Sequence, residues 1–363
     1  MRIILRRISA GAAALAAAGL FVAWAGIIDI RASTGHWRVT DWFLHWVMRS
    51  SVRTAALGGH APRFTAAMLP LAAGHYETGC AGCHGSPAMP RPAMVENMLP
   101  PPPDLQHVTA TWNDAQLFEI VKHGVRYTGM PAWPTLERDD EVWAMVAFLR
   151  EYPSLDQAAY QRLAGFSATG SPEFTTIVKS CEGCHSSPGL NETSLIPRLT
   201  DQSETYLRDS LEAYAAGKRP SGVMKVALSR TSSEDRKKLA DHFANQSAAT
   251  ETGRASEKSA RGKALAERGD RTRGIAACAA CHDAAGVNEA YPRLAGQPVP
   301  YLENQLGLFR SGNRGGGAYA GVMTRAATGL SDDDIQALAA YYSALSRMEA
   351  FLRDDVRRIA KSR

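Results

Sequence analysis

Three short stretches decide how this sequence folds, and they read Cys80-Ala81-Gly82-Cys83-His84, Cys181-Glu182-Gly183-Cys184-His185 and Cys278-Ala279-Ala280-Cys281-His282. Each stretch is a copy of one pattern, Cys-x-x-Cys-His, and the copies lie roughly 100 residues apart. Together they use all 6 cysteines of the 363-residue chain. No cysteine is therefore left over for a structural disulfide or for a lone thiol nucleophile.

The spacing within each copy suits covalent attachment of haem. Two cysteines three positions apart lie on neighbouring turns of a short helix and can form thioethers with the two haem vinyl groups, while the following histidine ligates the iron. A thioredoxin-like dithiol needs a strand–helix–strand setting, and a zinc site needs its cysteine pairs at much shorter spacing. The sequence therefore predicts three haem c groups, with His84, His185 and His282 as proximal ligands and with thioethers to Cys80, Cys83, Cys181, Cys184, Cys278 and Cys281.

The amino terminus carries a long apolar stretch. It begins with Arg2, Arg6 and Arg7 and then runs from Ile8 to Ile28 without a charge. At about 1.5 Å per residue, this stretch spans roughly the 30 Å core of a bilayer and is longer than the apolar region of a signal peptide. We expect residues 1–30 to be a retained transmembrane anchor, with cleavage after a signal-like segment as the alternative.

The haem motifs orient this anchor. Haem is attached to Cys-x-x-Cys-His motifs outside the cytoplasm, so the three motifs should lie on the periplasmic side of a bacterial inner membrane. The amino terminus is then expected to lie in the cytoplasm.

An amphipathic segment follows within residues 31–69. Val39, Trp42, Phe43, Trp46 and Val47 recur at the spacing of one helix face. Tryptophan next to a membrane span is typical of a helix that lies in the headgroup region. The alternative is a helix that docks this face on a haem domain or on a partner subunit.

The motif spacing divides the remaining chain into three predicted domains, named here unit one (70–160), unit two (165–247) and unit three (262–350). Each unit is expected to contain a helix, a haem motif, a loop with a methionine and a closing helix. Residues 248–261 are a predicted linker, rich in small and charged residues, and 351–363 a predicted basic tail.

Units two and three are an internal repeat. Both contain Pro-Arg-Leu followed at equal offsets by Tyr-Leu, Gly and Arg, and the matching residues are Pro197 and Pro292, Tyr206 and Tyr301, Gly217 and Gly312, and Arg219 and Arg314. Ser232 and Ser331 each precede acidic residues and a helical run, which is the signal of a helix N-cap.

The sixth iron ligands of units two and three follow by elimination. Unit three has no histidine besides the one in its motif, and Met348 lies at the end of the closing helix, which favours Met323. Met224 occupies the same repeat position in unit two. The spare histidine of unit two, His242, aligns with Tyr341 on the closing helix, where a structural role is expected.

Unit one offers several candidates, of which Met130 is predicted to be the ligand. It follows Gly129 and precedes Pro131, so the backbone is extended there and can pass close to a flat macrocycle. Met145 is expected in the core, and His123 is expected to cap or pack at a helix end. The other methionines of unit one lie in a proline-rich loop, and they are Met89, Met94 and Met98.

Iron with both a histidine and a methionine ligand is closed to substrate, and the soft thioether raises its potential. This coordination predicts electron transfer rather than catalysis. The charge balance of 41 Lys+Arg against 36 Asp+Glu, a net +5, does not suggest a nucleic-acid partner.

With these residues, the chain resembles the class I c-type cytochromes over residues 70–350. Units two and three are similar to the two-domain dihaem cytochromes c of bacterial periplasms through the stretches 291–297 (Tyr-Pro-Arg-Leu-Ala-Gly-Gln) and 330–335 (Leu-Ser-Asp-Asp-Asp-Ile). Unit one is similar to single-haem domains whose ligand loop reads Thr-Gly-Met-Pro-Ala-Trp, here residues 128–133.

The resemblance implies an all-α fold, here an N-terminal transmembrane helix followed by three cytochrome c-like helical haem domains. It also implies that the Pro197 and Pro292 carbonyls orient the proximal histidines. Arg198 and Arg293 are candidates to pair with haem propionates, with a surface salt bridge as the alternative.

The leading functional hypothesis is a membrane-anchored trihaem cytochrome that relays single electrons in a periplasmic respiratory chain towards a terminal oxidase. The expected partners are redox proteins: a quinol-side or dehydrogenase donor, and a terminal oxidase or soluble cytochrome as acceptor. One alternative is the cytochrome c subunit of a membrane-bound dehydrogenase. Another is a haem peroxidase, which requires an iron with an open position and an acid/base residue above it.

Overall fold

The computed structural model describes residues 2–31, 34–35, 37–165, 174–186, 193–246, 257–282 and 288–345. Within these ranges the chain is built from helices and two isolated β-bridges, which confirms the predicted all-α class. Met348, the basic tail 351–363 and the first part of the linker 248–261 lie outside the described residues.

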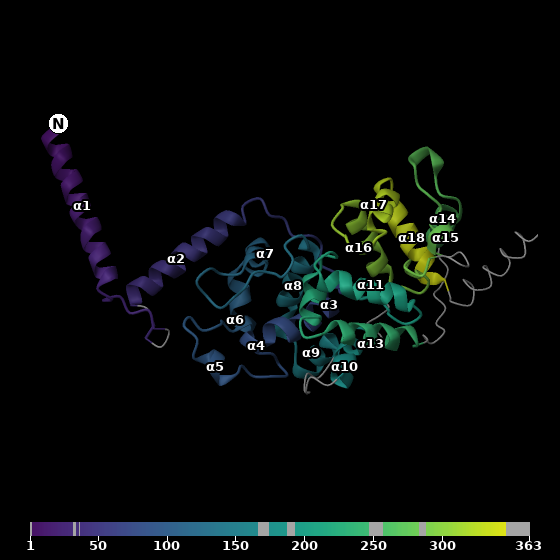
Figure 1. The fold of residues 1–363 in the computed structure, drawn as a ribbon, viewed down its shortest axis with the longest axis horizontal. Helices are drawn as coiled ribbons and strands as arrows, with labels where there is room; N and C mark the ends of the chain where they lie inside the picture. The colour runs from purple at the N-terminus through teal and green to yellow at the C-terminus, as the bar shows by residue number, and fades with distance from the viewer. Residues whose placement is uncertain are drawn as a thin grey trace, which may run out of the picture.

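The apolar amino-terminal stretch forms one long helix, α1 (Arg2–Trp24). Its segment Ile3–Trp24 has 22 residues and a mean hydropathy of 1.5, and none of it is buried in the molecule. Figure 1 shows α1 projecting away from the other helices. By length and composition α1 can cross a membrane, as an anchor or as a signal sequence.

The amphipathic segment forms α2 (Arg38–Ala55), and its two halves differ. In the second half Met48 and Val52 pack on the core of unit one, and the Arg49 guanidinium lies 4.8 Å from the centre of the Trp112 ring. In the first half Trp42 and Trp46 are 64% and 53% exposed. The second half of α2 is thus docked on a haem domain, whereas the first half presents its aromatic face to the surroundings.

Unit one packs its first helix, α3 (Met68–His75), against α8 (Asp139–Glu151) and α9 (Gln157–Ala164). A π-helical turn (Tyr76–Cys80) leads into α4 (Ala81–His84). The other helices are α5 (Ala93–Glu96), α6 (Leu105–Val108) and α7 (Asp114–His123), with 3-10 turns at Thr109–Thr111 and Tyr152–Ser154. The inner face of α8 forms the centre of this core with Val142, Met145, Val146 and Phe148, so the prediction that Met145 is a core residue is confirmed.

Units two and three use corresponding helices. Unit two contains α10 (Phe174–His185), α11 (Glu204–Ala215), α12 (Gly222–Ala227) and α13 (Ser233–Ala244). Unit three contains α14 (Glu257–Arg268), a 3-10 turn at Arg271–Arg273, α15 (Ala279–His282), α16 (Val299–Arg310), α17 (Ala320–Thr328) and α18 (Asp332–Ala344). Figure 1 shows unit two between the helices of units one and three.

One feature of the repeat differs from the expectation of a loop carrying the methionine. Met224 lies in α12 and Met323 in α17, so both methionines are helical. In unit two the reason is local, because the Ser221 side chain caps the helix by accepting a hydrogen bond from the Met224 backbone N–H at 3.1 Å.

Units two and three are joined by a reciprocal pair of glutamines. The buried Gln202 donates to the Arg293 carbonyl at 2.8 Å and accepts from the Arg293 N–H at 2.9 Å. Its repeat equivalent, Gln297, makes the same two bonds to Arg198, at 2.9 and 3.0 Å. Each unit thereby satisfies backbone groups of the other, which relates the two units by an approximate two-fold symmetry.

The closing helix of unit three begins with a capping box. Ser331 accepts from the Asp334 backbone N–H at 3.2 Å, and the Asp334 carboxylate accepts from the Ser331 N–H at 3.0 Å, as the N-cap signal predicted. The buried Asp334 side chain also pairs with Arg273 at 2.5 Å and Arg261 at 2.9 Å. These hydrogen bonds overcome the cost of burial and hold the pKa of Asp334 well below its usual range.

Replacing Asp334 by Asn should therefore destabilise unit three by about 1–3 kcal/mol, because two half-exposed cations lose the Asp334 carboxylate, although Arg273 keeps its pair with Asp270. A carboxylate with a lowered folded-state pKa contributes stability above its unfolded pKa of about 3.9 and loses it as the pH falls through the folded value. Thermal melts from pH 6 to pH 3 should show a smaller acid-induced loss for Asp334→Asn than for wild type. Equal slopes would contradict this assignment, and Asp333→Asn, on the same turn, is the matched control.

Candidate haem-binding sites

The three motif histidines share one hydrogen-bonding arrangement. Nδ1 lies 3.1 Å from the Pro103 carbonyl in His84, 2.8 Å from the Pro197 carbonyl in His185, and 2.9 Å from the Pro292 carbonyl in His282. A carbonyl oxygen only accepts, so Nδ1 carries the proton and Nε2 keeps its lone pair.

This tautomer is the one that an iron ligand requires. Burial lowers the pKa of all three histidines, which keeps the rings neutral at physiological pH. The two repeat carbonyls were expected from the resemblance. The Pro103 carbonyl was not, although the run of four prolines at 100–103 marked that loop as rigid.

Three of the motif cysteines lack the properties of a reactive thiol. Burial raises the pKa of Cys80 and Cys181 to about 12 and that of Cys184 to about 11, so these groups are thiols rather than thiolates at neutral pH. Redox dithiols and catalytic cysteines need a lowered pKa. The environment of these thiols therefore supports a role in attachment.

One large cavity of about 1030 Å³ is lined mostly by units two and three, with a smaller contribution from unit one. A typical single ligand pocket measures about 300–1,000 Å³. Both haem motifs and both repeat methionines line this hollow, and the residues are Cys181, Cys184, His185, Met224, Cys278, Cys281, His282 and Met323. The structure thus brings together the predicted ligand sets of the second and third motifs around a space large enough for two flat, largely apolar groups.

The wall of the cavity carries two buried cations at equivalent repeat positions, Arg219 and Arg314, which are 5% and 6% exposed. Burial and the like charge of Arg219 lower the pKa of Arg314. Arg219 donates to Ser210 at 3.0 Å, but its Nε has no hydrogen-bond partner within the described residues. Two buried like charges and an unpaired donor call for anions at this place.

Haem propionates meet that requirement, so the cavity fits haem in shape, polarity and donor set. The sequence analysis named Arg198 and Arg293 as candidate propionate partners, and both also line this cavity. The Arg293 guanidinium donates to the Asp201 carbonyl at 2.7 Å.

A histidine that the sequence analysis did not single out also lines this cavity. His75, at the end of α3 in unit one, is buried, and its ring centre lies 4.5 Å from that of Trp133. Its Nδ1 has no hydrogen-bond partner within the described residues, and burial lowers the pKa of His75 to about 4. Nothing in the sequence around it, beyond its position five residues before the first motif, distinguishes it from a surface histidine.

In unit one the predicted ligand Met130 lies in a loop and is partly buried. Its N–H donates to the Thr128 hydroxyl at 3.1 Å, and a Cβ at Gly129 would lie only 2.5 Å from the Met98 Cε. The close approach that requires glycine at 129 is thus made by Met98, which places a second sulfur-bearing side chain beside the loop.

The remaining candidates are placed elsewhere. Met94 is 83% exposed, and His123, at the end of α7, lies 3.7 Å from Glu119 on the surface. In unit two His242 lies 3.2 Å from Glu182 and 2.8 Å from Gln246, consistent with the structural role expected for it.

Helical units around Cys-x-x-Cys-His motifs, with carbonyl-fixed histidines and an apolar cavity, define the class of haem c electron-transfer proteins. The family model described as "Cytochrome C oxidase, cbb3-type, subunit III" matches residues 68–149, and the model described as "Cytochrome c" matches residues 259–346. The three cysteine pairs are consistent with three haems.

Two curated proteins each align with 46% of this chain. The thiosulfate dehydrogenase electron acceptor of Thiomonas intermedia is 35% identical over 173 residues, which is 78% of that protein. Cytochrome c4 of Pseudomonas aeruginosa is 33% identical over 169 residues, or 83% of its length. The crystal structure of reduced cytochrome c4 from Pseudomonas stutzeri is 30% identical, with a TM-score of 0.42 over 49% of this chain and 100% of that one.

The chain therefore belongs to the cytochrome c family and combines a cytochrome c4-like dihaem segment with a monohaem cytochrome c domain and an N-terminal apolar helix. Its activity is that of a cytochrome c4-like electron carrier, in agreement with the prediction of electron transfer rather than catalysis.

The fold of unit two depends on its haem, because the haem motif, Met224 and several apolar side chains of the unit line the cavity rather than a close-packed core. Without a bound group these apolar walls would be exposed to water, which destabilises the unit. The variant Cys181→Ala/Cys184→Ala should therefore contain two haems per chain and lose helical circular dichroism.

The control is Met224→Ala, which keeps both attachment cysteines and should keep three haems. A Cys181→Ala/Cys184→Ala protein with three haems, or one with two haems and an unchanged melting curve, would contradict this view of unit two.

Proposed function

We propose that the chain is a membrane-anchored trihaem cytochrome c that relays single electrons in a bacterial periplasmic respiratory chain. The observation that carries the proposal is the shared cavity, whose walls hold two complete sets of cysteines, histidine and methionine. When bound, each haem supplies a one-electron Fe(III)/Fe(II) couple. The proposed iron ligands are His84 with Met130, His185 with Met224, and His282 with Met323.

The chain's own residues set the conditions for this chemistry. The proline carbonyls hold each proximal histidine in the tautomer that presents Nε2. The methionine sulfurs would ligate the iron and favour its reduced state. The buried Arg219 and Arg314 provide positive charge next to the cavity, which favours the more negative, reduced form of a group bound there.

The comparisons support a role in carrying electrons from a dehydrogenase to an oxidase. One relative is named as the electron acceptor of thiosulfate dehydrogenase, and unit one matches a family named after a subunit of cbb3-type oxidase. We therefore propose a dehydrogenase or quinol-side donor and a terminal oxidase or soluble cytochrome as acceptor. The second candidate, a cytochrome subunit of a dehydrogenase complex, would be distinguished by co-purification with a large periplasmic subunit.

The domain boundaries at 70–160, 165–247 and 262–350 are part of the proposal, as is the topology. We propose that residues 1–30 anchor the protein with the amino terminus in the cytoplasm and the haem units in the periplasm. The exposed first half of α2, with Trp42 and Trp46, would then lie in the headgroup region of the same membrane.

The ligand assignment predicts that carbon monoxide leaves the absorption spectrum of the dithionite-reduced wild-type protein unchanged, because all three irons are closed. Each of Met130→Ala, Met224→Ala and Met323→Ala should open one iron and shift about a third of the haem absorbance when carbon monoxide is added. Met94→Ala, which changes an exposed methionine, is the control. A shift in the wild type would favour a haem enzyme, such as a peroxidase, over a carrier.

The anchor proposal predicts that the full chain stays in the membrane fraction after a carbonate wash, because a transmembrane helix is held by its buried apolar area. Trp42→Ser/Trp46→Ser should remain anchored but become more accessible to protease in the segment around α2. Release of the wild-type protein by carbonate, with an amino terminus beyond residue 25, would instead identify α1 as a cleaved signal.

A further inference from the structure

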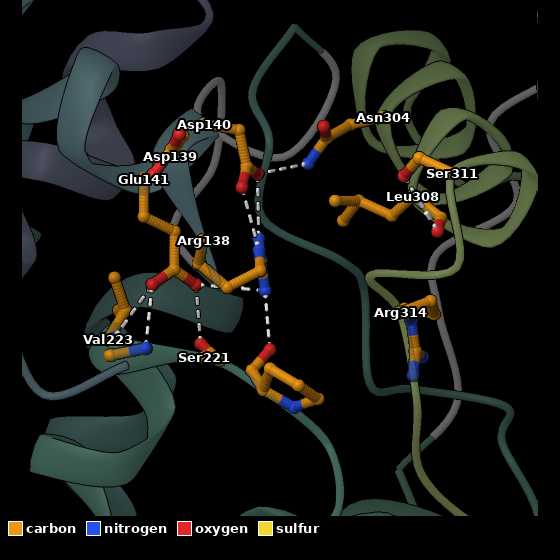
Figure 2. Close-up of polar contacts among 12 residues, drawn as sticks. Arg138, Asp139, Asp140, Glu141, Ser221, Val223, Asn304, Leu308, Ser311 and Arg314 are labelled. Atoms are coloured by element: carbon orange, nitrogen blue, oxygen red, sulfur yellow. Dashed lines mark hydrogen bonds and ion pairs between the residues drawn. The ribbon is translucent and has the colours of Figure 1, made fainter. Parts of the chain in front are cut away.

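A buried carboxylate of unit one binds the helix of unit two that carries Met224. Glu141, on α8, is 3% exposed. Figure 2 shows its carboxylate directed at the start of α12, where Oε1 accepts from the Ser221 hydroxyl at 2.6 Å and Oε2 accepts from the Gly222 N–H at 2.7 Å and the Val223 N–H at 3.3 Å. The first backbone N–H groups of α12, which no residue of that helix can satisfy, are thus bound from another unit.

The predicted ligand loop of unit one meets the same place. The Trp133 indole N–H donates to Glu141 Oε2 at 3.3 Å, and Trp133 follows Met130 by three residues. A Cβ at Gly222 would lie 2.2 Å from the Trp133 Nε1, so only glycine permits this approach. The methionine segments of units one and two are therefore in direct contact, through Trp133 on one side and Gly222 on the other.

Arg138 compensates the buried charge of Glu141. Its Nη1 lies 3.1 Å from Glu141 Oε1 and donates to the Pro220 carbonyl at 2.8 Å, just before α12. Its remaining nitrogens bind Asp140 at 2.7 and 2.8 Å, and Asn304 of unit three donates to the same carboxylate at 3.1 Å. A buried charge with this many partners has one favourable geometry, so the group holds its neighbours in a defined position.

Glu141 thus accepts three hydrogen bonds from the residues one to three positions before Met224. α12 has only 6 residues; besides its Ser221 cap, Arg138 donates to the Pro220 carbonyl before it and Lys225 donates to the Pro134 carbonyl at 3.3 Å. Glu141 is the group that binds the backbone of its first turn from outside, so the position of that turn depends on this carboxylate. We propose that Glu141 is a positioning residue that holds Met224 at its sixth-ligand position, and that unit one thereby sets the redox potential of the haem attached to unit two. This inference rests on the proposed function, in which Met224 is an iron ligand.

The test uses Glu141→Gln in the full-length protein and a spectroelectrochemical titration of all three haems. Gln keeps the shape but replaces one acceptor oxygen by a donor, so either the Arg138 guanidinium at Oε1 or the Gly222 N–H at Oε2 loses its acceptor. A loosened thioether favours ferric iron. At a fixed potential we expect at least a tenfold fall in the reduced-to-oxidised ratio of one haem, which is 59 mV for one electron, and a weakened methionine-to-ferric-iron absorption band.

The matched control is Asp139→Asn. Asp139 lies on the same turn as Glu141 but pairs with Lys122 and is half-exposed, so all three potentials should stay close to wild type. Ser221→Ala is the second variant, because it removes the hydroxyl that donates to Glu141 and caps the Met224 N–H without leaving a buried charge. If Glu141→Gln fails to accumulate, Ser221→Ala should still lower the potential of the same haem.

Met224→Ala identifies which haem to follow. If Glu141→Gln or Ser221→Ala shifts the potential of the haem whose potential Met224→Ala shifts, and Asp139→Asn does not, the inference is supported. If Met224→Ala shifts the potential of one haem and neither Glu141→Gln nor Ser221→Ala shifts it, the inference is overturned while the ligand assignment stands. If Met224→Ala shifts no haem potential and opens no iron to carbon monoxide, the ligand assignment itself is overturned, and the inference with it.

Discussion

The structure depends on a cavity that its own side chains do not fill. Between units two and three, where a protein of this size would have a close-packed core, the helices surround about 1030 Å³ of largely apolar space. A large planar group bound in that space would bury its apolar walls and so stabilise units two and three. Folding of this chain and covalent attachment of haem therefore depend on each other. The Cys-x-x-Cys-His motifs contribute to the core as well as to the redox chemistry.

A second constraint comes from charge. Arg219 and Arg314 face the cavity, and Glu141 lies buried at the contact of units one and two. Isolated buried charges are costly, so each must be matched, and the partners come from another unit or from the bound group. The contacts between units are consequently polar and specific: Gln202 and Gln297 join units two and three, whereas Glu141 joins units one and two.

Much of the local structure could be predicted because it depends on neighbours in sequence. The N-caps at Ser232 and Ser331, the helical class and the core position of Met145 each follow from spacing or from residue type within one or two turns. The helical setting of Met224 was not predicted, since the stretch is too short for periodicity to show. Glu141 read as an ordinary acidic residue in the first turn of a helix, and no feature of the sequence distinguishes it from the exposed Asp139.

The sequence by itself determined the chemistry: six cysteines and three histidines in one pattern admit covalent haem and little else, because thioether formation and iron ligation depend on spacing of a few residues. Only the tertiary structure decided which charges are buried, which glycine lets Trp133 approach α12, and that two haem motifs share one cavity. Those properties arise from contacts between residues about 80–100 positions apart, and burial at such separations depends on how the units pack rather than on any local pattern.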